Sequence, residues 1–105
     1  MGRYAVGFLI PKDANRVLGD DGWEFESDSR IPLSIETLLS SVFSLRESAS
    51  GYSSYEGSKI RADVFKDKNG EIENIYFRFY ESVPPELPDF LKVDEYSKNL
   101  EFFVP

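Results

Sequence analysis

IRADVFKDKNGEIENIYFRFY, residues 60–80, is the stretch of sequence that decides the fold. Its Asn69-Gly70 step lies between two runs of strand-like residues, and Asn-Gly is the preferred pair of a two-residue type I′ hairpin turn. With that turn the paired positions are Val64 with Ile75, Ala62 with Phe77, and Ile60 with Phe79. One face of the hairpin is then wholly apolar, and a one-residue slip would mix the two faces. The sequence therefore predicts which face meets the core.

The opposite face of this hairpin carries charged and aromatic residues. In the same register Arg61 lies across from Arg78, and like charges in direct opposition are destabilising unless an anion covers them. We expect carboxylates of the same chain to cover the pair, and the candidates are Glu24, Glu26, Glu86, Asp89, Asp94 and Glu95. Otherwise Tyr76, Arg78 and Tyr80 form an open sheet face with the composition of a binding hot spot.

Three further segments are predicted to be strands or packed ends. Arg3 to Ile10 is almost continuously apolar, which is typical of a central strand covered on both faces. Pro11 ends that strand, and Lys12 to Leu18 is expected to form a turn or two of helix. Trp23 to Glu26 alternates apolar with acidic residues, as a half-exposed strand does. The end of the chain, Leu100 to Pro105, is expected to be a last strand or a segment packed on the core.

One main helix is predicted from about Ser34 to Arg46, with Ser34 as its capping residue. Its apolar residues recur at helical spacing and are Ile35, Leu38, Leu39, Val42 and Phe43. A short helix is also expected around Pro88 to Lys92. Together these elements predict one α+β domain over residues 1–105, with a single-layer, mostly antiparallel sheet of about four or five strands. The main amphipathic helix packs on that sheet and the short helix follows near the C-terminus.

Residues 47–58 offer no apolar face and are rich in Ser and Gly, so they are expected to form a long loop. Tyr52 and Tyr55 stand in that context, followed by Glu56. Recognition loops use the same mixture, because Tyr gives contact area at low entropy cost while Ser and Gly adapt. The segment is therefore either a contact loop or a mobile connection.

The composition excludes much of catalytic chemistry. The 105 residues include no Cys and no His, which removes disulfides, thiolate metal sites and every Ser-His or Cys-His pair. No phosphate-binding glycine motif is present, so we expect no enzymatic activity, no cofactor and no metal. The remaining route to catalysis would be a carboxylate pair with one raised pKa. No apolar run approaches membrane-spanning length and no secretory signal is recognisable, so a cytoplasmic protein is expected.

The chain is acidic, with 12 Lys and Arg against 19 Asp and Glu, a net charge of −7. Direct binding of nucleic acid is disfavoured by that charge, and a cationic protein is the better partner. In size, charge and composition the chain resembles the small immunity proteins of bacterial toxin systems, the class of barstar and of the partners of contact-dependent growth-inhibition toxins. The resemblance implies a role, which is to bind a cognate toxin, often a basic nuclease, in the cytoplasm. We expect the chain to block the active site or substrate surface of that toxin, and a monomer is favoured.

Eight residues are predicted to contact the partner: Glu24, Glu26, Tyr52, Tyr55, Glu56, Tyr76, Arg78 and Tyr80. The alternative is a regulatory or assembly module, such as a phage-encoded inhibitor, that holds an acidic partner or RNA on the face of Arg61, Arg78, Tyr76 and Tyr80. The two hypotheses differ in which surface they require to be open to a partner. A covered arginine pair with exposed carboxylates favours the antagonist.

Overall fold

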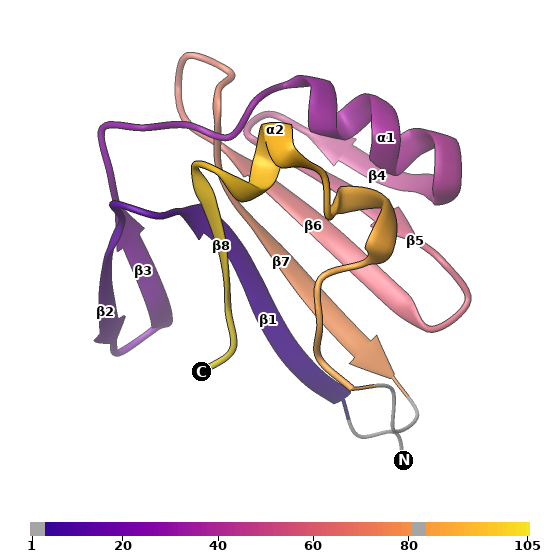
Figure 1. The fold of residues 1–105 in the computed structure, drawn as a ribbon, viewed down its shortest axis with the longest axis horizontal. Helices are drawn as coiled ribbons and strands as arrows, with labels where there is room; N and C mark the ends of the chain where they lie inside the picture. The colour runs from indigo at the N-terminus through magenta and orange to yellow at the C-terminus, as the bar shows by residue number, and fades with distance from the viewer. Residues whose placement is uncertain (1–3, 81–83) are drawn as a thin grey trace.

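The computed structural model describes residues 4–80 and 84–105, which form an α+β fold (Figure 1). The strands are β1 (Tyr4–Pro11), β2 (Asn15–Gly19), β3 (Gly22–Glu26), β4 (Ser44–Ala49), β5 (Tyr52–Glu56), β6 (Ile60–Lys66), β7 (Ile72–Tyr80) and β8 (Leu100–Phe103). The helical segments are α1 (Ser34–Val42), the 3-10 turn η1 (Asp89–Leu91) and the single turn α2 (Asp94–Ser97). Arg3, the first residue of the predicted N-terminal strand, lies outside the described residues.

Six strands form one antiparallel sheet in the order β4-β5-β6-β7-β1-β8, and β2 pairs with β3 in a separate hairpin. The predicted α+β class and antiparallel sheet are therefore confirmed. The position of β1 between β7 and β8 confirms the prediction of a central strand. The sheet is larger than the four or five strands expected, because β4 and β5 extend it on one side.

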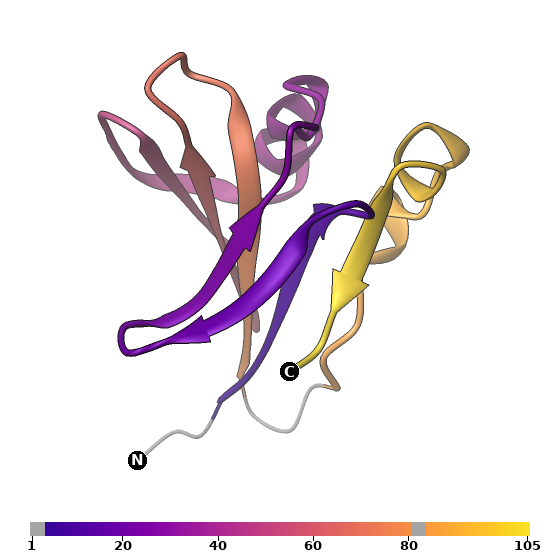
Figure 2. The ribbon, with the colours of Figure 1, turned by 90° about the vertical axis from the view of Figure 1, so that its left-hand side faces the viewer.

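Different elements cover the two faces of the sheet. Successive side chains of a strand point to opposite faces, so Leu9 packs in the main core with α1, η1 and α2, while Phe8 and Ile10 pack on the other side. On the helix side α1 contributes the buried residues Ile35 and Leu39. On the other side the β2–β3 hairpin stands against β1, and Figure 2 shows it across the sheet from the helical segments. We call this second side the hairpin face.

The register predicted for residues 60–80 is confirmed. Strands β6 and β7 pair Val64 with Ile75 and Arg61 with Arg78. Val64 and Ile75 are fully buried on the helix side, so the predicted core face is also confirmed. The alternation of apolar and polar residues determines this register, because a shift by one residue would place arginines in the core.

The turn that joins β6 and β7 is longer than predicted. The N–H of Gly70 donates to the carbonyl of Asp67 at 3.0 Å, so Lys68 and Asn69 are the central residues of the turn. The N–H groups of Asn69 and Glu71 donate to the Asp67 carboxylate at 2.8 and 3.0 Å, which stabilises this longer loop. Gly70 does take a positive φ of 79°, at the position of a G1 bulge. A second irregularity at the end of β6 restores the predicted register.

Helix α1 ends at Val42 rather than at Arg46, because Phe43 is extended and β4 begins at Ser44. Residues 44–49 instead pair with β5, and this pairing between strands prevails over the helical spacing of the sequence. Ser34 makes no capping hydrogen bond. Its hydroxyl lies 3.0 Å from the hydroxyl of Tyr96 instead, so the prediction of a Ser34 cap is wrong.

The prediction of a long loop over residues 47–58 is also wrong. This segment belongs to the β4–β5 hairpin, which turns at Gly51 with φ 79°. Strand β5 pairs with β4 on one side and with β6 on the other, so its backbone groups are satisfied by the sheet. Local preference for turns is overridden by pairing with neighbouring strands.

The remaining predictions have mixed outcomes. The segment from Lys12 to Leu18 contains no helix, because residues from Asn15 onward form β2 and pair with β3. The predicted strand around Trp23 and the predicted last strand are confirmed as β3 and β8. The short helix expected near Pro88 is the 3-10 turn η1. Across residues 4–80 and 84–105 the helices are too short and too polar to cross a membrane.

Candidate functional site

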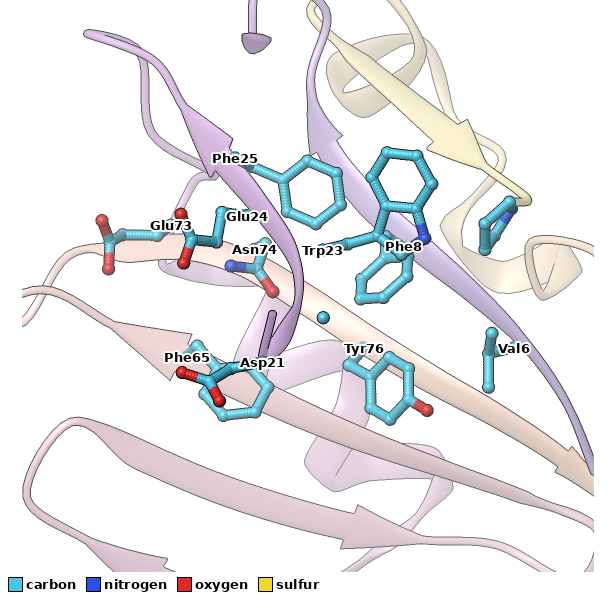
Figure 3. Close-up of a pocket in the computed structure, with 12 residues that line it drawn as sticks. Val6, Phe8, Asp21, Trp23, Glu24, Phe25, Phe65, Glu73, Asn74 and Tyr76 are labelled. Atoms are coloured by element: carbon cyan, nitrogen blue, oxygen red, sulfur yellow. The ribbon is translucent and has the colours of Figure 1, made fainter. Parts of the chain in front are cut away.

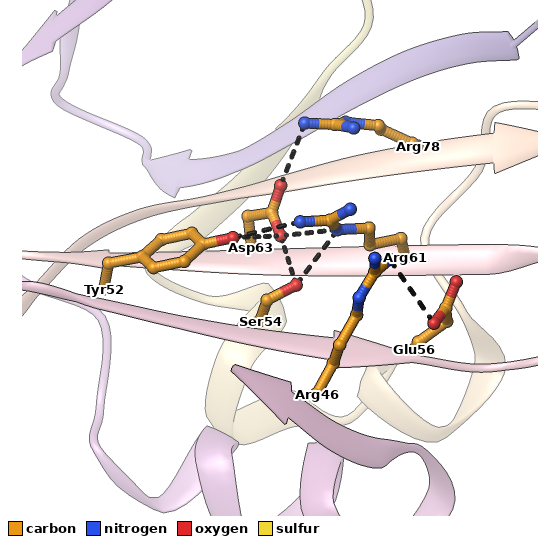
Figure 4. Close-up of polar contacts among 7 residues, drawn as sticks. All are labelled: Arg46, Tyr52, Ser54, Glu56, Arg61, Asp63 and Arg78. Carbon is orange, nitrogen blue, oxygen red and sulfur yellow. Dashed lines mark hydrogen bonds and ion pairs between the residues drawn. The ribbon is translucent and has the colours of Figure 1, made fainter. Parts of the chain in front are cut away.

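The arginine pair on the hairpin face is neutralised by a carboxylate of its own strand. Asp63 on β6 is only 2% exposed, and its Oδ1 accepts a hydrogen bond from Arg61 Nε at 3.1 Å (Figure 4). Its Oδ2 accepts from Arg78 Nη2 at 3.4 Å. The carboxylates expected to cover the pair, such as Glu24 and Glu26, are not the ones that do so. Asp63 lies two residues from Arg61 along β6, so its side chain points to the same face.

Two side chains of β5 complete this Asp63 cluster. Ser54 donates its hydroxyl to Asp63 at 2.7 Å and accepts Arg61 Nε at 3.0 Å. The hydroxyl of Tyr52 accepts Arg61 Nη2 at 3.1 Å. This bond is the main reason that the pKa of Arg61 is raised above its usual value. The cluster joins β5, β6 and β7 and holds the sheet together on this face.

Tyr55 is not available to a partner. It points into the main core, is 6% exposed, and donates its hydroxyl to Glu36 on α1 at 2.9 Å. Burial first and Glu36 second raise its pKa to about 12. Lys66 also binds Glu36, at 2.7 Å, so these residues tie α1 to the sheet. The prediction that Tyr55 contacts a partner is therefore contradicted by its position.

Glu56 and Tyr52 lie on the hairpin face, and both side chains already contact other residues of the chain. Glu56 is exposed at the end of β5 and lies 3.6 Å from Arg46 (Figure 4). The ring of Tyr52 packs on Phe65 with 5.7 Å between centroids. Both side chains are partly accessible at the far edge of the face, although the contact loop expected to present them is absent.

The hairpin face is hollowed between β3 and the strands β1, β6 and β7. This aromatic groove has a volume of about 680 Å³ and an apolar floor formed by Val6, Phe8, Trp23, Phe25, Phe65 and Tyr76 (Figure 3). The floor is a set of touching rings. Phe8 lies 4.9 Å from both Phe25 and Tyr76. Tyr80 lies on β7 beyond the groove and is half-buried.

Carboxylates rim the aromatic groove. Asp21, Glu24 and Glu73 line it, and Figure 3 shows their side chains on the same side of the ring floor. A neighbouring polar hollow is lined by Asp13, Glu26, Asp28 and again Glu73. No Lys or Arg is among the described residues that line either depression.

Four carboxylates of this face have no ion-pair partner in the part of the chain that the structure describes. Asp21, Glu24, Glu26 and Asp28 are exposed, and none forms an ion pair with another residue of the described ranges. Asp13 is held by neutral hydrogen-bond donors instead. Hydrogen bonds first from Ser27 (2.5 Å) and then from Ser29 (3.0 Å) lower the pKa of its carboxyl. Within residues 4–80 and 84–105 no three potential metal ligands lie close enough to share an ion.

The structure brings together only part of the predicted site. Glu24 and Tyr76 line the aromatic groove, and Glu26 lies in the hollow beside it. Arg78 lies at the border, with its guanidinium 5.3 Å from the centre of the Tyr76 ring. Sequence reasoning missed Asp21, Phe65 and Glu73 as neighbours, because they come from a turn and two strands far apart in the chain.

Comparison of the chain with protein-family models, with curated proteins and with solved structures found no match. The function must therefore be argued from the geometry.

Proposed function

We propose that this chain is a protein-binding antagonist, an immunity protein that neutralises a cationic toxin by covering its active site or substrate surface. The observation that carries the proposal is the division of charge on the hairpin face. The arginine pair is neutralised internally by Asp63. The carboxylates Asp21, Glu24, Glu26 and Asp28 are exposed, and among residues 4–80 and 84–105 they form no ion pair. That division supports the antagonist over the module that would use the arginines.

Physical chemistry favours such a surface for inhibition. Charges that are paired within the chain contribute little to the field outside it, but unpaired carboxylates attract a cationic macromolecule over a Debye length of about 8 Å at physiological salt. The attraction accelerates encounter and suppresses wrong partners. Carboxylates can also occupy the place that phosphates take on a basic nuclease. A nuclease domain is therefore the partner proposed.

The competing proposal is a regulatory or assembly module that binds an acidic partner on the face of Arg61, Arg78, Tyr76 and Tyr80. It receives less support, because the side chains of Arg61 and Arg78 are 15% and 31% exposed and both are bonded to Asp63. An acidic partner would have to compete with that buried carboxylate. The antagonist proposal needs no such rearrangement, and it places the protein as a monomer in a bacterial cytoplasm.

The proposal is tested with the product of the gene next to the one that encodes this chain. We expect that product to be a basic toxin that binds this chain and loses its activity in the complex. Glu24→Lys combined with Glu26→Lys should slow association by about tenfold or more at low salt, since steering is lost. Asp94→Lys combined with Glu95→Lys is the matched control, because it changes the net charge equally and both residues are exposed but line neither the groove nor the hollow.

Two results would contradict the proposal. One is a neighbouring product that is not basic or that keeps its activity with this chain present in excess. The other is an association rate that stays constant between low and high salt, because a steered encounter slows as salt screens the charges.

A further inference from the structure

The aromatic groove is built to hold its shape before anything binds. Its rings are fixed by contacts with other rings: Phe8 lies 4.9 Å from Tyr76, and Trp23 lies 4.9 Å from Phe103, which packs behind the groove. The rings that line the groove project from β1, β3, β6 and β7, which are regular strands rather than loops. A site on strands loses little conformational entropy when it is occupied.

The volume of about 680 Å³ lies within the range of about 300–1,000 Å³ that is usual for ligand sites. The floor leaves apolar surface in contact with water, since Phe65, which forms part of it, is 37% exposed. An occupant that covers this floor is stabilised in proportion to the apolar area that it removes from water. The occupant must therefore have an apolar part.

The rim adds a second requirement, which is positive charge. Asp21, Glu24 and Glu73 line the groove, and no Lys or Arg does so among the described residues. An occupant that is apolar along its stem and cationic at its tip satisfies both requirements. Lysine and arginine side chains have this build.

The ring cluster already holds two guanidinium groups of the chain itself. Arg16 lies over Phe103 with 4.9 Å from its central carbon to the ring centre, and Arg78 lies over Tyr76 at 5.3 Å. Arginine stacks on aromatic faces, and its guanidinium is more weakly hydrated than the ammonium of lysine. It therefore loses less hydration free energy when it enters a ring-lined groove. Both observations favour arginine.

We infer that the aromatic groove binds an arginine side chain presented by the cationic partner protein, with its stem on Phe8, Trp23 and Tyr76 and its guanidinium at the acidic rim. This inference rests on the proposed function, since it supplies the anchor of that interface. A buried arginine in a pocket of aromatic rings is a common centre of binding energy in protein interfaces.

Trp23 allows a direct test, because it is the only tryptophan of the chain and it lines the groove. The probe is the blocked peptide acetyl-Gly-Arg-Gly-amide, titrated at low salt while Trp23 fluorescence is recorded. A saturable change is expected with the arginine peptide. The same peptide with citrulline, which is neutral and nearly isosteric, should bind at least about tenfold more weakly, and the lysine peptide at an intermediate level.

Substitutions in the groove test whether the peptide binds there. Asp21→Asn with Glu24→Gln should weaken the arginine peptide by about tenfold, because both rim charges are removed. Phe65→Ala should weaken it by about threefold through loss of apolar contact. Glu95→Gln, which lies outside the groove, should bind as the wild type does. Thermal melting of each variant shows that it is folded.

Several outcomes would overturn the inference: no saturable response, equal binding of the citrulline peptide, lysine binding as tightly as arginine, or full binding by the rim variant. A dimer in solution that the peptide does not dissociate would also overturn it, because a second copy would then fill the groove. If the peptide binds but no toxin is neutralised, the proposed function is wrong and the groove assignment stands. If the toxin is neutralised equally by the rim variant, only the groove assignment is wrong.

Discussion

Arg61 on β6 lies directly opposite Arg78 on β7, and both guanidinium groups bond to the same buried carboxylate, that of Asp63. Opposed like charges on a sheet are unfavourable, so this register depends on the anion between them. The pairing explains why two arginines on a strand face need not mark a binding site for an acidic partner. In this fold the two arginines and Asp63 link β6 to β7.

Asp63→Asn should destabilise the protein strongly. The change leaves two partly buried guanidinium groups without their anion, and breaking a buried ion pair from one side typically costs about 3–5 kcal/mol. The free energy of unfolding is measured by urea denaturation with Trp23 fluorescence. Adding Arg61→Met to Asp63→Asn should recover part of the loss, because one uncompensated charge is removed. A cost below about 1 kcal/mol for the single change would show that water or other groups replace the carboxylate.

The β6–β7 hairpin shows what the sequence could predict. Alternation of apolar residues around Asn69-Gly70 determined both the core face and the pairing of Arg61 with Arg78, because a slip of one residue would bury charge. The turn itself was predicted incorrectly. The side chain of Asp67 accepts hydrogen bonds from two backbone N–H groups, which stabilises the longer turn. The Asn-Gly pair alone does not indicate these bonds.

Pairing between distant segments accounts for what the sequence could not show. Residues 47–58 are locally typical of a loop, yet β5 is held between two strands, so Tyr55 is turned into the core. The aromatic groove likewise joins Asp21, Phe65 and Glu73 from separate elements. Local preferences describe a segment alone, whereas the neighbours of a strand are set by the topology of the whole sheet.

Gly70→Val should destabilise the fold by about 1–2 kcal/mol, since left-handed backbone is costly for a residue with a β-branched side chain. Gly70 has φ 79°, and a Cβ there would meet no atom within 4 Å, so the cost is conformational rather than steric. Gly70→Asn should cost clearly less, because asparagine tolerates this region. The measurement is the thermal midpoint of each variant. Equal midpoints for valine and asparagine would contradict the argument.

Gly7→Ala should be destabilising for the opposite reason. A Cβ on Gly7 would overlap the ring of Phe102, which is itself packed on Phe77 and Phe79. Overpacking of this kind typically costs about 1–3 kcal/mol. Gly19→Ala is the control, because its nearest atom would lie at an ordinary 3.6 Å. Denaturant unfolding should separate the two variants, and Phe102→Leu in the Gly7→Ala background should restore stability. Equal stability of both alanine variants would mean that the ring moves without cost.

The buried phenol of Tyr55 should make stability fall at high pH. Burial and the bond to Glu36 raise its pKa from 10.0 to about 12 in the folded protein, so between these values the unfolded chain has lost a proton that the folded protein keeps. The contribution of Tyr55 is therefore complete below pH 10 and is lost as the pH rises toward 12, by about 2–3 kcal/mol in total.

Tyr55→Phe removes this dependence and also the hydrogen bond to Glu36, which is worth about 1 kcal/mol. Wild type should therefore be the more stable protein at neutral pH and the less stable one as the pH approaches 12, so the two curves of unfolding free energy should cross. Urea denaturation at a series of pH values measures both curves. Parallel curves through this range would mean that Tyr55 titrates alike in the folded and unfolded states, against its burial in the core.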